Sequence, residues 1–175
     1  MSDYITTSSK IHFTPLKPKK EQIVIEDIAH SLSLMTRANG HFPEFYSVAQ
    51  HCIHCYEEAV ARGYDKRLAM ACLLHDASEA YLADITRPVK KNLPKYLVIE
   101  KILQDAIYEK FLGSKLTEEE QKMVSEVDDV LLYYEFEHYM GEKLQENEPV
   151  IKSRPEFCFV PFAEVEKKYI EFSQI

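Results

Sequence analysis

The sequence contains no tryptophan and only four glycines among its 175 residues. With so few glycines, it has neither the glycine-rich loop that binds phosphates in P-loop proteins nor the Gly-x-Ser-x-Gly turn that carries a nucleophilic serine. It also lacks a run of about 20 apolar residues, which is the length that a membrane helix needs. These absences argue against a P-loop enzyme, a serine hydrolase and an integral membrane protein.

Basic residues are in the minority, since 21 Lys and Arg stand against 29 Asp and Glu. A surface with this balance repels the backbone of a nucleic acid, so we expect a small-molecule partner and neither a nucleic-acid polymer nor a membrane. The first ten residues, MSDYITTSSK, lack the charged head and the apolar run of a signal peptide. We therefore expect a cytoplasmic protein whose four cysteines are reduced thiols.

Apolar residues make up 46% of the chain and recur at helical spacing along most of it. We predict an all-α fold with one domain over residues 1–175, a core at about 23–140, and an irregular C-terminal segment at 141–175 that carries a short helix at 163–172. The other predicted helices cover about 23–37, 48–62, 66–81, 99–112 and 117–139. Residues 87–94, flanked by prolines, are predicted to form a basic loop.

A nearly unbroken apolar run at 68–74 leads into His75, Asp76 and Glu79. Burial of an ionised carboxylate beside an imidazole is costly without a partner, and a divalent cation is one of the few partners that offset the cost. His51, which lies beside an apolar helical stripe, offers a second imidazole, the commonest metal ligand. The simpler alternative is a hydrogen-bonded core histidine next to an aspartate that pairs with a lysine or caps a turn.

Asp128 is a carboxylate on a helix face that is otherwise apolar, because Val124 precedes it by four residues and Leu131 follows it by three. Only one of two adjacent aspartates can face the core of an amphipathic helix. We favour Asp128, although a rotated helix would bury Asp129 instead.

His51, the doublet His75-Asp76 and Asp128 together resemble the H…HD…D signature of the HD-domain phosphohydrolases. Residues 75–90 read HDASEAYLADITRPVK. This segment resembles the bacterial and phage deoxynucleotide phosphohydrolases, which read HDxSE, then an Asp, then Pro-Val-Lys. The resemblance covers roughly residues 25–137 and implies a helical bundle with a divalent metal ion (Mn, Co, Zn, Fe or Mg) between its helices. The metal ligands that it implies are His51, His75, Asp76 and Asp128.

The same resemblance assigns proton transfer to Glu79 and Asp84. One carboxyl group would activate the attacking water and the other would protonate the leaving oxygen, and the sequence does not decide which does which.

Phosphate binding requires cationic donors, and the densest basic cluster near the motif contains Arg87, Lys90, Lys91 and Lys95. A solvated loop is the alternative for such a charged run. Arg37 lies upstream of the His51 helix, where this family often places substrate contacts. The expected substrate-binding residues are Arg37, Arg87, Lys90 and Lys91.

The expected reaction is metal-dependent hydrolysis of a deoxynucleotide phosphate ester. Four cations exceed the need of one phosphate, and the chain resembles the small phage triphosphohydrolases, including those selective for dATP. We therefore predict release of deoxynucleoside and triphosphate from a dNTP by a homo-oligomer, with dATP as one candidate substrate and the base left open. A 5′-deoxynucleoside monophosphatase is the alternative, although the Arg-Trp pair of that subgroup is missing.

Two alternatives come from other classes. A non-catalytic nucleotide-binding module would keep the fold, and loss of a metal ligand would mark it. A di-iron oxygenase would need further histidines, for which His54 and His30 are the candidates. A Cys-x-x-Cys motif, Cys52 to Cys55, lacks the second cysteine pair of a zinc ribbon, so we interpret Cys52 as core and Cys55 as a small filler.

Overall fold

Helices form the body of the structure, a computed structural model that describes residues 3–174. The longer helices are α1 (Ile25–Leu34), α2 (Val48–Ala61), α3 (Lys66–Leu73), α5 (Pro94–Leu112), α6 (Glu118–Met140) and α7 (Phe162–Ser173). The short connecting helices are η1 (Lys20–Gln22), η2 (Arg37–Gly40), η3 (Ala77–Ala80) and α4 (Arg87–Lys90). The predicted all-α fold is confirmed.

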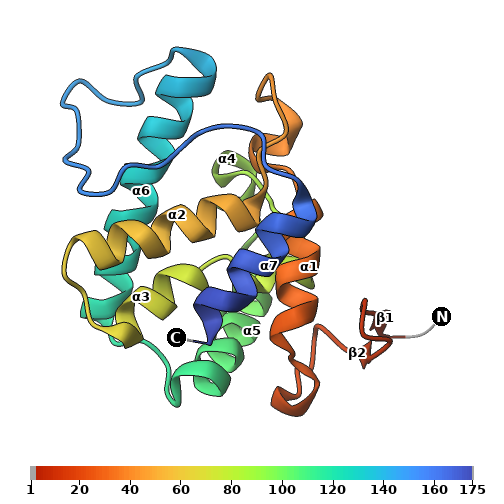
Figure 1. The fold of residues 1–175 in the computed structure, drawn as a ribbon. Helices are drawn as coiled ribbons and strands as arrows, with labels where there is room; N and C mark the ends of the chain where they lie inside the picture. Colours follow the sequence, from red (N-terminus) through yellow and green to blue (C-terminus); the bar gives the residue numbers. More distant parts are fainter. Residues whose placement is uncertain (1–2, 175) are drawn as a thin grey trace.

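The helices pack around a main core, and α7 returns from the end of the chain to complete it (Figure 1). A smaller cluster contains Phe42, Tyr46 and Tyr139. It lies along α1, while α3 lies along α2 and α6 contacts both α2 and α3. The core extends beyond the predicted 23–140, because Phe13, Val165 and Tyr169 are buried in it. Of the helices in the described part of the chain, none is both long enough and apolar enough to cross a bilayer.

Helix starts agree with the capping residues in the sequence. The Thr117 hydroxyl accepts a hydrogen bond from the Glu120 amide (3.1 Å), and the Glu120 carboxylate accepts one from the Thr117 amide (2.7 Å). Ser47 and Gln50 form the same reciprocal pair at the start of α2. At the end of α5, Gly113 has the left-handed conformation (φ 82°) that favours glycine, and the helix stops there.

Two expectations about local structure are wrong, and one element was not predicted. The helix predicted at 66–81 ends at Leu73. Beyond this point the Ala77 amide donates to the Leu74 carbonyl (2.9 Å) in a tighter turn, and Ser78 donates its amide hydrogen to Gln104 Oε1 (3.1 Å). The predicted basic loop contains α4, where Pro88 occupies the first turn and needs no amide partner. The N-terminal segment forms a small antiparallel hairpin of β1 (Ile5–Thr6) and β2 (His12–Phe13), which has no alternating pattern long enough to predict it.

The irregular segment between α6 and α7 passes over α2 and is held there by a buried carboxylate (Figure 1). Glu58 accepts hydrogen bonds from the amides of Lys152 (3.0 Å) and Ser153 (2.7 Å) and pairs with Arg62 (2.7 Å). Gln50 donates to the Cys158 carbonyl (3.1 Å). The backbone of this segment therefore satisfies its polar groups against α2 and not within a helix.

Candidate metal centre

Two imidazoles from different helices meet at their Nε2 atoms. His51 on α2 and His75 just after α3 place these atoms 3.2 Å apart. His51 Nδ1 donates to Glu135 Oε1 (2.5 Å), and His75 Nδ1 donates to the Cys72 carbonyl (2.8 Å). With a metal ion bound, each ring would be neutral with its hydrogen on Nδ1, and the Nε2 lone pairs of both rings would face the same small volume.

Two carboxylates complete this group. Asp76 Oδ2 lies 3.3 Å from His75 Nε2 and 4.0 Å from His51 Nε2, and Asp128 Oδ1 lies 3.1 Å and 3.8 Å from His51 and His75 Nε2, respectively. Donor atoms that share one divalent ion at about 2.1 Å lie roughly 3.0–3.4 Å from each other. Three of the five separations, 3.1–3.3 Å, fall within this range, and two, of 3.8 and 4.0 Å, exceed it. The donor types and the three shorter separations fit a divalent metal ion. All four ligand candidates predicted from the sequence come together.

The rotation of α6 places Asp128 inward and Asp129 outward. The side chain of Asp128 is 20% exposed, and that of Asp129 is 60% exposed. Arg87 contacts both carboxylates, at 2.6 Å from Asp128 and 2.7 Å from Asp129. This is the helix rotation expected from the apolar spacing around Asp128.

Arg37 lies within the same group and contacts three carboxylates. Its guanidinium is 3.5 Å from Asp76, 3.9 Å from Asp128 and 3.2 Å from Glu135. Although burial raises the pKa of Asp76, the neighbouring His75 and Arg37 hold that pKa well below its usual range. Asp76 is therefore an anion at neutral pH, as a metal ligand must be.

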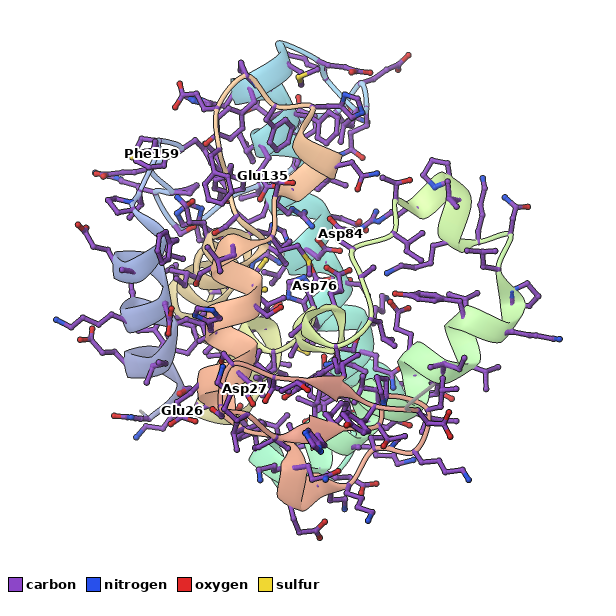
Figure 2. The ribbon with its side chains drawn as sticks, turned by 90° about the vertical axis from the view of Figure 1, so that its right-hand side faces the viewer. Glu26, Asp27, Asp76, Asp84, Glu135 and Phe159 are labelled. Atoms are coloured by element: carbon purple, nitrogen blue, oxygen red, sulfur yellow. The ribbon has the colours of Figure 1, made fainter. Side chains whose placement is uncertain are left out.

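Glu135 is a site residue that the sequence reasoning missed. It is fully buried on α6 and accepts from His51 Nδ1, from the Tyr46 hydroxyl (3.0 Å) and from Arg37. In Figure 2, Asp84 and Asp76 lie between Glu135, toward the top of the view, and Asp27, toward the bottom. A spacing of seven residues from Asp128 puts Glu135 on the same helix face, and this spacing is the signal that could have found it.

The two expected proton-transfer residues lie beside the centre. Glu79 is buried, and its Oε2 has no hydrogen-bond partner among the described residues, while Lys90 Nζ lies 3.5 Å from its Oε1. Burial and the charges of Asp76 and Asp84 raise the pKa of Glu79 to about 9, although Lys90 opposes them. Burial also raises the pKa of Asp84. Glu79 is therefore protonated at neutral pH and can donate a hydrogen.

Two cavities open onto the centre and share Asp76, Lys90 and Asp128 as lining residues. One of about 420 Å³ lies between η2, the 84–90 segment and α6. Its charged lining also includes Arg37, Glu79, Asp84 and Arg87, and its apolar lining includes Phe42, Leu132, Phe136 and Leu144. The other, of about 500 Å³, lies between α5 and α6, and most of the residues that line it are polar or charged.

The basic cluster predicted to bind phosphate is divided by the structure. Arg87 and Lys90 line the 420 Å³ cavity, and Lys90 also pairs with Glu100 (2.7 Å). Lys91 and Lys95 are exposed and line neither cavity. The structure therefore brings Arg37, Arg87 and Lys90 to the centre but not the fourth expected substrate-binding residue, Lys91.

Two cysteines also lie close to the ligand candidates. Cys55 Sγ is 3.5 Å from His51 Nε2. Cys52 Sγ lies within 4.8 Å of a ligand atom of His75 and of Asp76. Both thiols are buried and free. Cys52 belongs to the core, as interpreted from the sequence, whereas Cys55 borders the candidate metal centre.

Known family models do not match this sequence. Over 108 residues it is 43% identical to the uncharacterized protein YfdR of Escherichia coli (strain K12), an alignment that covers 62% of this chain and 58% of YfdR. Over 133 residues it is 36% identical to an uncharacterized protein of Rhodobacter capsulatus, covering 72% of this chain and 67% of that protein. Neither name states an activity. The chain belongs to the same family as this Rhodobacter capsulatus protein.

Proposed function

We propose that the protein is a metal-dependent phosphohydrolase of the HD-domain type that acts on a deoxynucleotide phosphate ester. The observation that carries the proposal is the meeting of two imidazole Nε2 atoms and two carboxylates, with each imidazole held by a hydrogen bond from its Nδ1. A divalent ion bound there would polarise a phosphoryl oxygen and lower the pKa of a bound water. This arrangement suits ester hydrolysis without a protein nucleophile.

The residues around the centre suit a phosphate ester. Arg37, Arg87 and Lys90 carry positive charge along the 420 Å³ cavity, where they can bind the phosphate oxygens. Protonated Glu79 is placed to donate a hydrogen to the leaving oxygen, which makes it the general acid of the proposal. Asp84 is the remaining carboxyl group in the cavity and is the candidate for orienting the attacking water.

The apolar side of the cavity suits the organic part of a nucleotide. Phe42 and Phe136 are packed against each other with their ring centroids 5.4 Å apart, and both line the cavity. An aromatic and aliphatic wall opposite charged groups is typical of sites that bind a base and sugar next to a phosphate. We therefore propose a deoxynucleoside triphosphate as substrate, with dATP as the first to test.

A 5′-deoxynucleoside monophosphate is the second candidate substrate. Lys91 and Lys95 lie outside both cavities, so fewer cations face the centre than the sequence predicted. Less positive charge is needed for one phosphate than for three.

The first test is incubation of the protein, loaded with Mn²⁺, Co²⁺ or Zn²⁺, with each dNTP, NTP and dNMP, followed by chromatography of the products. We expect deoxynucleoside and triphosphate, and we expect a chelator to abolish the reaction. Phosphate released from monophosphates alone would identify the second candidate. Nucleotide binding without turnover for any metal would identify a non-catalytic module and refute the proposal.

Glu79→Gln should keep metal affinity and lower kcat by roughly 10²- to 10⁴-fold, because the amide resembles the protonated acid but does not release a proton. If Glu79 is the general acid, kcat of the unmodified protein should fall as the pH rises through about 9, and the variant should lack that fall. The measurement is a pH profile of kcat for each protein. Glu100→Gln is the matched control, since Glu100 also pairs with Lys90. An unchanged rate for Glu79→Gln would rule out this role.

A further inference from the structure

A side-chain amide from α5 is inserted into the backbone where α3 ends. In a continuous α-helix, Ser78 would donate its amide hydrogen to the Leu74 carbonyl four residues earlier. Here Ser78 N donates to Gln104 Oε1 (3.1 Å), and Gln104 Nε2 donates to the Leu74 carbonyl (2.7 Å). The Gln104 amide thus takes the place of the helical hydrogen bond between Ser78 and Leu74. The Leu74 carbonyl also accepts from the Ala77 amide (2.9 Å), and the Leu73 carbonyl accepts from the Tyr169 hydroxyl (2.9 Å).

The interruption lies across His75 and Asp76. Consecutive side chains on an α-helix diverge by about 100°, so neighbours in sequence do not face the same point. Leu74 (φ −94°, ψ 0°) and Asp76 (φ −100°, ψ 11°) depart from helical geometry toward the bridge region. With this backbone, His75 Nε2 and Asp76 Oδ2 come within 3.3 Å of each other.

Gln104 is held in place by the helix that carries it. Its neighbours Leu103 and Ile107 are fully buried in the core, so α5 cannot shift without loss of packing. Gln104 itself is half-buried and lines the cavity between α5 and α6 together with His75 and Asp76. Both polar atoms of its amide make hydrogen bonds at the interruption.

We propose that Gln104 is a positioning residue of the metal centre, because its amide keeps the chain interrupted at Leu74 and thereby directs His75 and Asp76 to one ion. This inference rests on the proposed metal centre. It predicts that loss of the amide lets Ser78 bond directly to Leu74, which favours a continuous helix and separates the two ligands.

The test compares Co²⁺ binding by the unmodified chain and three variants, using titration of the visible cobalt absorption and far-ultraviolet circular dichroism. Gln104→Met keeps the side-chain length and removes both hydrogen bonds, while Gln104→Glu keeps only the acceptor for Ser78. Gln121→Met is the matched control, because Gln121 lines the same cavity but bonds to the Leu116 carbonyl (3.3 Å), away from the interruption. We expect Gln104→Met to keep a helical circular-dichroism spectrum. Its Kd for Co²⁺ should rise by roughly 10- to 100-fold, and its visible cobalt absorption spectrum should change.

Gln104→Glu should lie between the unmodified chain and Gln104→Met, and Gln121→Met should match the unmodified chain. A folded Gln104→Met with an unchanged Kd and cobalt spectrum would overturn the inference and leave the metal centre standing. If that variant does not fold, Gln104→Glu decides, since an unchanged Kd there has the same meaning. Failure of the unmodified chain to bind cobalt would instead overturn the metal centre and with it the proposed function.

Discussion

Asp128→Ala is expected to abolish metal binding and turnover, whereas Asp129→Ala should leave both intact. Asp128 Oδ1 lies 3.1 Å from His51 Nε2, whereas the side chain of Asp129 is 60% exposed and faces away from the centre. The comparison is closely matched because Arg87 pairs with both carboxylates, so each variant loses one contact with the same guanidinium. Equilibrium dialysis with elemental analysis measures the bound metal.

Retention of metal by Asp128→Ala would remove this residue from the ligand set. Loss of metal from Asp129→Ala alone would mean that α6 is rotated relative to the structure. A helical circular-dichroism spectrum is required of both variants, so that loss of metal is not mistaken for loss of fold.

Glu135→Met is expected to have the second large effect, on stability as well as on metal affinity. Its carboxylate is fully buried between His51 and Arg37, so its removal leaves a buried guanidinium with fewer partners and should cost about 3–5 kcal/mol in the free energy of unfolding. His51 would also lose the acceptor for its Nδ1 hydrogen, which should weaken metal binding by roughly 10- to 100-fold. Urea unfolding of the chelator-treated protein measures the first effect, and metal titration measures the second.

Glu137→Met is the control for this variant, since Glu137 lies on the same helix, is partly exposed and pairs with Lys143. Its loss should change neither quantity. A stability for Glu135→Met equal to that of Glu137→Met would contradict the role given to the buried carboxylate.

The pH dependence of this contribution follows from the charge on Glu135. Burial raises its pKa, but His51 and Arg37 outweigh burial and hold that pKa below its ordinary value of 4.5. A lowered pKa in the folded state stabilises the fold above the ordinary value, and the stabilisation is lost as the pH falls through the lower one. The difference in unfolding free energy between the unmodified chain and Glu135→Met should therefore be full at neutral pH and shrink in acid.

The sequence predicted the helices best where a helix is determined by its own residues. The capping box at Thr117 and the apolar spacing along α6 are local, and both the start of that helix and the inward side of Asp128 agree with them. The end of α3 is not local. It depends on Gln104, which lies 26 residues from Ser78 and 30 from Leu74. The apolar pattern within residues 66–81 therefore does not predict where the helix ends.

The same distinction applies to the candidate site. His51, His75, Asp76 and Asp128 could be selected because a polar group on an apolar face needs a partner, whichever helix carries it. The charged residues of the 87–94 segment lie on no apolar face, so the sequence does not indicate which of them point toward the site. The turn of α4 directs Arg87 and Lys90 toward the cavities and leaves Lys91 exposed, a division that depends on how α4 sits against its neighbours.

The two cavities that share Asp76, Lys90 and Asp128 open onto the centre from two different sides. An organic group seated against Phe42 and Phe136 would cover these residues from one side only. From the other side, between α5 and α6, the same carboxylates stay in contact with solvent. In the proposed reaction, water and ions could therefore exchange at the centre through the cavity between α5 and α6 while the nucleotide is still bound. Because the centre has two openings, the geometry does not impose one order of substrate binding and product release.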